Sequence, residues 1–145
     1  MKCGPIWWII AANPRFALTR DVGAITMDMD GVATVTVQAL GGADTLTVNN
    51  LAGTAVTQVN LDLAATGGGG DGSADTVAIN GTASPDTIDL AANAGNVIAT
   101  GLAAQVQIAH PELAYDSLTV NGPGGTDSFI VGPGVTTLIG VVLNQ

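Results

Sequence analysis

One short pattern recurs along this 145-residue chain and constrains its fold more than any other feature. An aspartate is followed by Thr or Ser, and then by residues in which apolar positions alternate with others. This alternation is typical of a β-strand with one face on a core and the other in solvent. The five copies are Asp44-Thr-Leu-Thr-Val, Asp75-Thr-Val-Ala-Ile, Asp86-Thr-Ile-Asp-Leu, Asp116-Ser-Leu-Thr-Val and Asp127-Ser-Phe-Ile-Val.

The spacing of these aspartates is regular. Asp75 and Asp86 are 11 residues apart, as are Asp116 and Asp127. Asp75 precedes Asp116 by 41 residues, Asp86 precedes Asp127 by 41, and Asp44 precedes Asp86 by 42. Such periods are typical of stacked repeats. The spacing therefore predicts three copies of a unit of about 41 residues, the last one truncated.

The repeat predicts an all-β fold, a right-handed parallel β-solenoid (β-helix or β-roll) of about six coils. At this unit length each coil takes about 20 residues and adds about 4.8 Å along the axis. Leu46, Ile88 and Phe129 are then expected in one apolar column. The alternative is an antiparallel β-sandwich, because Asn80-Gly81 and Asn121-Gly122 are typical hairpin turns.

The length is that of one domain, in which we expect residues 1–20 to cap the repeat domain of residues 21–145. The opening MKCGPIWWIIAA holds a short apolar run that Pro5 interrupts. It is interpreted as a cap over the first open strands or as a signal-peptide remnant. The run is shorter than the about 20 apolar residues that a membrane-spanning helix needs.

Composition and charge narrow the classes of partner. The net charge of −9, with only 3 Lys and Arg, argues against binding to nucleic acid or to an anionic membrane surface, and favours divalent cations. Membrane insertion is not expected either, because no apolar run is long enough. Hydrophobic residues make up 47% and aromatic residues 3%, so the core is expected to be aliphatic. The single Cys3 excludes an internal disulfide and a Cys-based zinc site. Scarce Lys and abundant Asp are typical of secreted bacterial proteins.

Two segments carry a family resemblance. Leu40-Gly-Gly-Ala-Asp44-Thr-Leu and Gly122-Pro-Gly-Gly-Thr-Asp127-Ser-Phe resemble the RTX nonapeptide, the haemolysin-type calcium-binding repeat G-G-x-G-x-D-x-U-x. The stretch from about Arg20 to Val131 is similar to repeat domains of large secreted bacterial proteins. The resemblance implies a parallel β-roll or β-helix, an extracellular location and bound Ca²⁺. No copy in this chain has the complete nonapeptide.

Calcium takes oxygen ligands, and the candidate ligands are aspartates. The strongest single loop is Thr66-Gly-Gly-Gly-Gly-Asp71-Gly-Ser-Ala-Asp75, where glycines let the backbone curl around an ion. The competing interpretation is that each aspartate accepts hydrogen bonds from turn N–H groups. The full set of candidate metal ligands is Asp44, Asp71, Asp75, Asp86, Asp116 and Asp127.

The leading functional hypothesis is a calcium-associated, non-catalytic structural or adhesion module of a secreted bacterial protein. The alternative is a small metal-assisted hydrolase of the esterase, phosphoesterase or glycosidase type, in which Asp carboxylates hold the ion. Its catalytic residues would be His110, Glu112 and Asp116. The apolar tail Thr137-Leu-Ile-Gly-Val-Val-Leu143 further predicts a homo-oligomer formed through the solenoid ends.

Overall fold

The computed structural model describes residues 3–12, 14–22 and 24–145. In these ranges the chain forms thirteen strands and one short 3-10 helix, η1. Their bounds are β1 Cys3–Ala12, β2 Arg15–Arg20, β3 Ile25–Met29, β4 Thr34–Leu40, β5 Ala43–Val48, β6 Gln58–Ala65, β7 Thr76–Asn80, β8 Thr87–Asn93, β9 Asn96–Thr100, β10 Gln105–Ala109, β11 Ser117–Asn121, β12 Ser128–Val131, η1 Val135–Thr137 and β13 Gly140–Asn144. No helix in the described ranges has the length and apolar character needed to cross a membrane.

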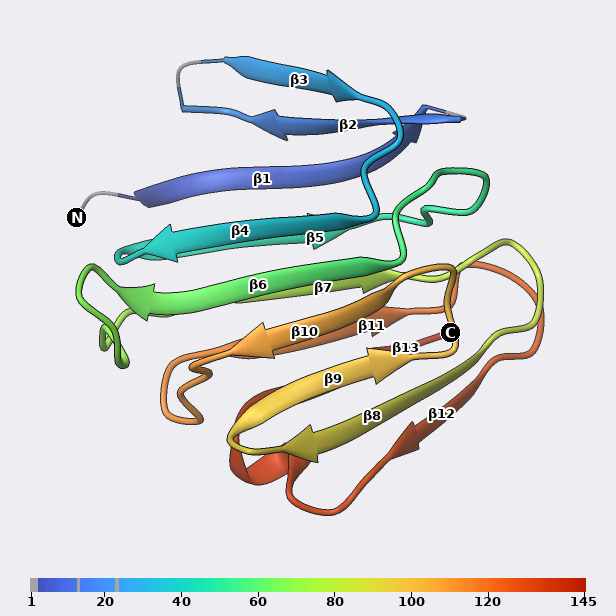
Figure 1. Ribbon diagram of the computed structural model, residues 1–145. Helices are drawn as coiled ribbons and strands as arrows, with labels where there is room; N and C mark the ends of the chain where they lie inside the picture. Colours follow the sequence, from blue (N-terminus) through green and yellow to red (C-terminus); the bar gives the residue numbers. More distant parts are fainter. Residues whose placement is uncertain (1–2, 13, 23) are drawn as a thin grey trace.

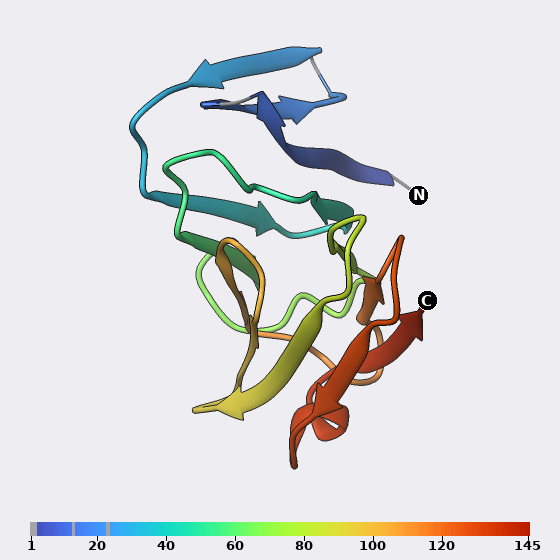
Figure 2. The ribbon, with the colours of Figure 1, turned by 90° about the vertical axis from the view of Figure 1, so that its right-hand side faces the viewer.

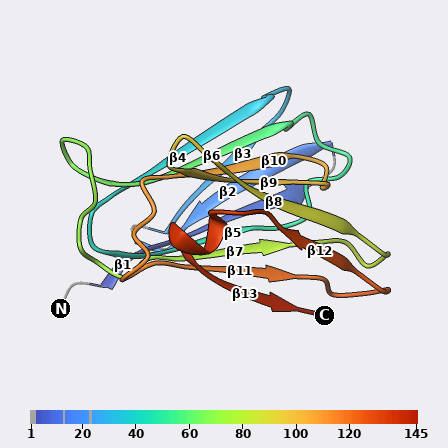
Figure 3. The same cartoon turned by 90° about the horizontal axis from the view of Figure 1, so that it is seen from below.

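The strands form two mixed sheets that face each other (Figures 1 and 3). The seven-stranded sheet has the order β13-β11-β7-β5-β1-β2-β3, and the six-stranded sheet has the order β12-β8-β9-β10-β6-β4. Seven of the eleven described strand pairings are parallel. The other four, β1–β2, β2–β3, β8–β9 and β9–β10, are antiparallel.

The chain passes from one sheet to the other through turns at two edges of the molecule. The tightest passage joins β4 to β5 through Gly41 and Gly42 alone, whose φ angles are 97° and 106°. Residues with a Cβ adopt such angles only with strain, so the two glycines make this short crossing feasible. Longer loops make the other crossings, among them those at 66–75 and 110–116 on the same edge and those at 81–86 and 122–127 on the opposite one.

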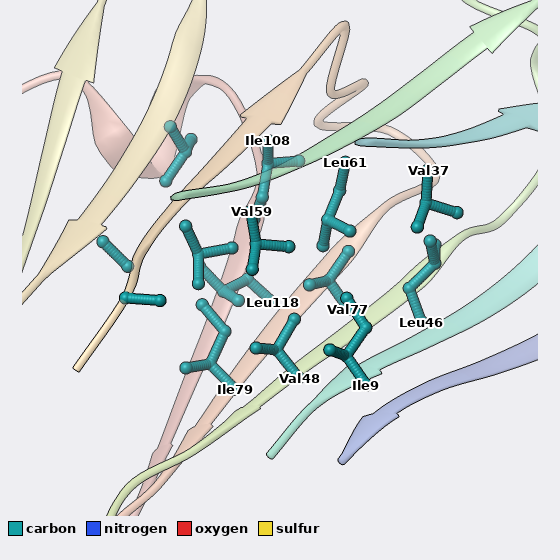
Figure 4. Packing of buried hydrophobic residues seen from close by; sticks show 14 of the residues in the cluster. Ile9, Val37, Leu46, Val48, Val59, Leu61, Val77, Ile79, Ile108 and Leu118 are labelled. Atoms are coloured by element: carbon teal, nitrogen blue, oxygen red, sulfur yellow. The ribbon is translucent and has the colours of Figure 1, made fainter. Parts of the chain in front are cut away.

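The core lies between the sheets and is filled by alternating aliphatic residues (Figure 4). The burial pattern of β4, for example, alternates strictly between exposed and buried positions. Burial of each Val, Leu or Ile side chain stabilises the fold by about 1.5–3 kcal/mol. The core residues labelled in Figure 4 are Ile9, Val37, Leu46, Val48, Val59, Leu61, Val77, Ile79, Ile108 and Leu118.

The predicted right-handed parallel β-solenoid of about six coils is wrong. The structure has two mixed sheets, sandwich-like in arrangement, with antiparallel strands at β1–β2–β3 and β8–β9–β10. The expected apolar column is split: Phe129 pairs with Ile88 in the six-stranded sheet, whereas Leu46 lies in the seven-stranded sheet and pairs with Val77. The alternative interpretation, a sandwich, is closer, although most pairings are parallel and not antiparallel.

The error has a physical cause in the second repeat. Asp75 and Asp116, at the 41-residue spacing, do occupy equivalent places before β7 and β11. Asp44, however, is equivalent to Asp75, which is 31 residues away, and not to Asp86. The extra length between Asp75 and Asp116 accommodates β9, which doubles back between β8 and β10. A reversal of chain direction inside the repeat thus replaces a uniform coil.

A row of asparagine side chains crosses the seven-stranded sheet at the carboxyl ends of its parallel strands. Asn80 Nδ2 donates to Asn49 Oδ1 at 2.9 Å, and Asn121 Nδ2 donates to Asn80 Oδ1 at 2.7 Å. Asn144 Nδ2 donates to Asn121 Oδ1 at 2.9 Å, and Asn49 Nδ2 donates to the carbonyl oxygen of Ile9 at 3.3 Å. This asparagine ladder ties β1, β5, β7, β11 and β13 together at positions where strand hydrogen bonding ends.

The asparagine ladder yields a stability prediction. Asn121→Ala removes two amide hydrogen bonds and leaves polar groups of Asn80 and Asn144 without partners, so it should lower the free energy of unfolding by about 2 kcal/mol. The matched control Asn144→Ala removes one bond at the edge strand and should cost less than about 1 kcal/mol. Urea denaturation of both variants measures the difference. Equal losses would contradict a cooperative ladder.

Candidate acidic site

Three aspartates stack at the edge where the chain enters β5, β7 and β11. The backbone N–H of Asp44 donates to Asp75 Oδ1 at 2.8 Å, and the backbone N–H of Asp75 donates to Asp116 Oδ1 at 3.0 Å. Their exposed fractions are only 1%, 1% and 4%. The carboxylates of Asp75 and Asp116 therefore do what the competing interpretation predicted, since each accepts a hydrogen bond from a backbone N–H group, whereas the carboxylate of Asp44 accepts none.

Two further acidic residues come from the loops beside this row. Asp71 accepts hydrogen bonds from the N–H groups of Gly42 and Ser73, both at 2.8 Å. Glu112 Oε2 accepts one from the N–H of Gly72 at 2.8 Å. A Cβ on Gly70 would collide with the Glu112 carboxylate, so the glycines of this loop permit the close approach. We call the resulting group the acidic edge, which consists of Asp44, Asp71, Asp75, Glu112 and Asp116.

Several carboxylate oxygens of the acidic edge are buried without a hydrogen-bond partner. They are both oxygens of Asp44 and Oδ2 of Asp75, within the part of the chain that the structure describes. Burial raises the pKa of Asp44 to about 6 and that of Asp75 to about 7, with the negative charge of Asp71 adding to both effects. Burial also raises the pKa of Asp116. Burial therefore makes the ionised form of these aspartates costly at neutral pH.

The residues of the acidic edge have the ligand type that a hard cation prefers, but their side chains are not arranged at metal-ligand distances. Carboxylate oxygens are the ligands that Ca²⁺ prefers, and it takes six to eight oxygens. Among residues 3–12, 14–22 and 24–145, no three His, Cys, Asp or Glu side chains stand at metal-ligand spacing. An ion at this edge would therefore have to draw in side chains, carbonyl groups of the Gly67–Gly72 loop, or water.

The structure divides the six predicted metal ligands into two groups. Asp44, Asp71, Asp75 and Asp116 meet at the acidic edge, whereas Asp86 and Asp127 lie together at the opposite edge. There the backbone N–H of Asp86 donates to Asp127 Oδ1 at 2.8 Å. Asp86 in turn accepts hydrogen bonds from the N–H and hydroxyl groups of Thr82, at 2.6 and 3.0 Å.

Glycines make room for this second pair of carboxylates. A Cβ on Gly81 would lie 2.5 Å from Asp86 Oδ2, and a Cβ on Gly122 would collide with Asp127 Oδ2. The Asn-Gly pairs at these positions therefore do not mark hairpin turns. They end β7 and β11, and each glycine admits the carboxylate of the next strand's aspartate.

The three residues predicted for catalysis are not brought together as an acid–base set. Glu112 and Asp116 are occupied with backbone N–H groups, including that of Glu112 itself, which donates to Asp116 Oδ2 at 2.7 Å. His110 instead pairs with Asp62 of β6, with 2.7 Å between Nδ1 and Oδ1. Its φ of 56° is unusual for a residue with a side chain. Sequence reasoning did not single out Asp62, because the partners are 48 residues apart.

Comparison of the chain with protein-family models, with curated proteins and with solved structures finds no match for it. The resemblance to RTX repeats consequently stays a prediction, and the functional argument depends on the geometry above.

The buried carboxylates predict an acid-stabilised fold. Folded-state pKa values of about 6 and 7 for Asp44 and Asp75 exceed the ordinary value of 3.8, so the folded protein binds more protons than the unfolded chain between these limits. Their stabilising contribution is complete below about pH 4 and is lost as the pH rises through 6 to 7. The free energy of unfolding should fall by at least about 2 kcal/mol over this window.

Urea denaturation in metal-free buffer, from pH 4 to pH 8, measures this slope. Asp75→Asn should flatten it, because an amide keeps the acceptor for the Asp44 N–H but does not ionise. Asp89→Asn, at an exposed position of β8, is the matched control and should leave the slope unchanged. A wild-type protein that is most stable at pH 8 would contradict the prediction.

Proposed function

We propose that the protein is a non-catalytic structural module that takes up Ca²⁺ at the acidic edge and serves in adhesion outside the cell, as part of a secreted bacterial protein. The observation that carries the proposal is the carboxylate of Asp44, which is 1% exposed and has no hydrogen-bond partner for either oxygen. A buried carboxylate without a partner is costly, and a proton or a cation relieves that cost.

A cation is the better counter-charge at neutral pH. Protons fill the acidic edge only as the pH falls toward the raised pKa values of Asp44 and Asp75. Ca²⁺ neutralises two carboxylates at once and takes its remaining ligands from carbonyl groups and water. The Gly-rich loop ahead of Asp71 has φ angles of 106°, 87° and 87° at Gly67, Gly68 and Gly69, and it is exposed. Its backbone carbonyl groups are the additional ligands that we propose.

Thermal unfolding tests the calcium proposal. At pH 7.5 the wild-type melting temperature should be higher in 5 mM Ca²⁺ than in chelator, by about 5 °C or more, because the ion binds only the folded state. At pH 4.5, where protons occupy the buried carboxylates, the difference should largely disappear. Asp44→Asn should also abolish it.

Asp86→Asn is the matched control, since Asp86 lies at the opposite edge and outside the acidic edge. It should keep the calcium response at pH 7.5. A wild-type melt that chelator does not shift, together with a purified chain that holds no calcium by metal analysis, would remove the proposal.

The second candidate function, a small metal-assisted hydrolase, is favoured by one observation, the 2.7 Å contact between His110 Nδ1 and Asp62 Oδ1. A carboxylate in that place orients the imidazole and supports it as a base. Esterase, phosphoesterase and glycosidase assays on the wild type and on His110→Ala decide between the two functions. We expect no turnover with either protein. Turnover that disappears in the variant would establish the hydrolase instead.

We also propose that the protein associates with itself through the ends of its sheets. The edge strands β12 and β13 lie at one end and β3 and β4 at the other, and each has one side without a strand partner among the described residues. At the first end Ile130, Val142 and Leu143 are large apolar side chains with exposed fractions of 48%, 49% and 39%. Exposed strand edges with apolar residues favour pairing with another copy.

Light scattering across a concentration series tests this association. The wild type should gain mass as its concentration rises, whereas Val142→Lys should stay monomeric, because a charge on an edge strand opposes pairing. Val22→Lys, at an equally exposed apolar position outside any strand, is the control. A wild type that stays monomeric at millimolar concentration would refute the proposal.

A further inference from the structure

A cavity of about 590 Å³ lies between the first strands of the seven-stranded sheet and the last strand of the six-stranded sheet. Pro5 and Trp7 of β1 and Arg20 of β2 line one side, and residues 36 and 38–41 of β4 and its turn line the other. In Figure 2 the strands β1–β3 extend beyond the level at which the six-stranded sheet ends. β4 is the edge strand there, so no further strand of the described chain fills the space.

Arg20 gives this cavity its chemical character. Its guanidinium carbon lies 5.1 Å from the centre of the Trp7 ring, a stacking arrangement that holds the planar group in place. Within the described ranges no carboxylate oxygen lies within 4.0 Å of its nitrogens, and its buried Nε has no hydrogen-bond partner. The buried Nε1 of Trp7 also lacks a partner.

The lack of an ion pair is informative because this chain is so acidic. It has 12 Asp and Glu against 3 Lys and Arg. The other arginine, Arg15, does find a carboxylate, with 2.8 Å between Nε and Asp28 Oδ1. Asp44 is near enough for the Arg20 charge to lower its pKa somewhat, against the larger effect of burial, but the two residues form no ion pair within 4.0 Å. Arg20 is therefore a fixed positive charge with free donors at the wall of a cavity.

We propose that this cavity binds a small organic carboxylate. The carboxylate would face the guanidinium, whose forked donors match its two oxygens. The rest of the molecule would pack on Trp7, Pro5 and Leu40 and form hydrogen bonds with Thr36 and Gln38. A volume of about 590 Å³ is typical of small-molecule sites. This inference goes beyond calcium uptake, because the ligand is an anion and the residues that hold it are not those of the acidic edge.

Tryptophan fluorescence and calorimetry, both in chelator to exclude calcium, test the site with two acids and their neutral analogues. The probes are galacturonate with galactose, and benzoate with benzamide. At least one acid should bind wild-type protein saturably, and its neutral analogue should bind at least about tenfold more weakly. Arg20→Gln should weaken binding of that acid by at least about tenfold, whereas Arg15→Gln, which loses the same charge outside the cavity, should bind as the wild type does.

A second variant separates loss of the site from loss of the fold. Gln38→Glu changes an exposed residue of β4 and adds a negative charge at the cavity wall, so it should keep the wild-type melting temperature and still weaken the acid. The proposal is overturned if neither acid binds below about 10 mM, if acid and neutral analogue bind equally, or if Arg15→Gln weakens binding as much as Arg20→Gln. Since chelator is present throughout, none of these outcomes depends on calcium.

Discussion

The hydrogen bond from the backbone N–H of one aspartate to the carboxylate of the next organises this molecule. It occurs between Asp44 and Asp75, between Asp75 and Asp116, and between Asp86 and Asp127. Each bond satisfies a backbone donor where a turn meets a strand, and thereby fixes the register of neighbouring parallel strands. The same bonds hold the carboxylates inside the protein. The hydrogen bond between successive aspartates therefore both sets the strand register and keeps carboxylates buried in the protein.

The sequence predicted the strands well and their arrangement in part. Alternation correctly predicted β5, β7, β8, β11 and β12 after the five aspartates. The 41-residue spacing correctly related β7 to β11 and β8 to β12, but coils of about 20 residues would have separated the members of each pair by one coil, whereas they pair directly. The spacing wrongly made Asp44 equivalent to Asp86, when its structural equivalent is Asp75. The reason is that residues Ala91 to Thr100 carry no strong sign that the chain reverses its direction within this repeat. The asparagine ladder was missed although Asn80 and Asn121 also show the 41-residue spacing, since both were interpreted as turn residues.

Most residues of the acidic edge could be predicted from the sequence, but which of the candidate aspartates lie together could not. Four of its five residues were candidate ligands, but only three-dimensional pairing separates them from Asp86 and Asp127. Contacts between remote loops, such as Glu112 with Gly72, leave no local pattern in the chain. The cavity beside Arg20 was missed for the same reason, because Trp7 was interpreted as a cap and its stacking partner comes from a different strand. The sequence shows which chemical groups the chain carries, whereas the topology of the fold decides which of these groups lie next to one another.

The asparagine ladder has a direction. Every amide nitrogen points toward the strand that precedes it in the row, from Asn144 back to Ile9. The amide oxygen of Asn144 consequently faces outward at the β13 edge, with no strand of the described chain beyond it. Two such edges brought face to face would set oxygen against oxygen. A strand that extends the row must supply an N–H group at that point, which makes growth from this edge polar and disfavours a symmetric pair.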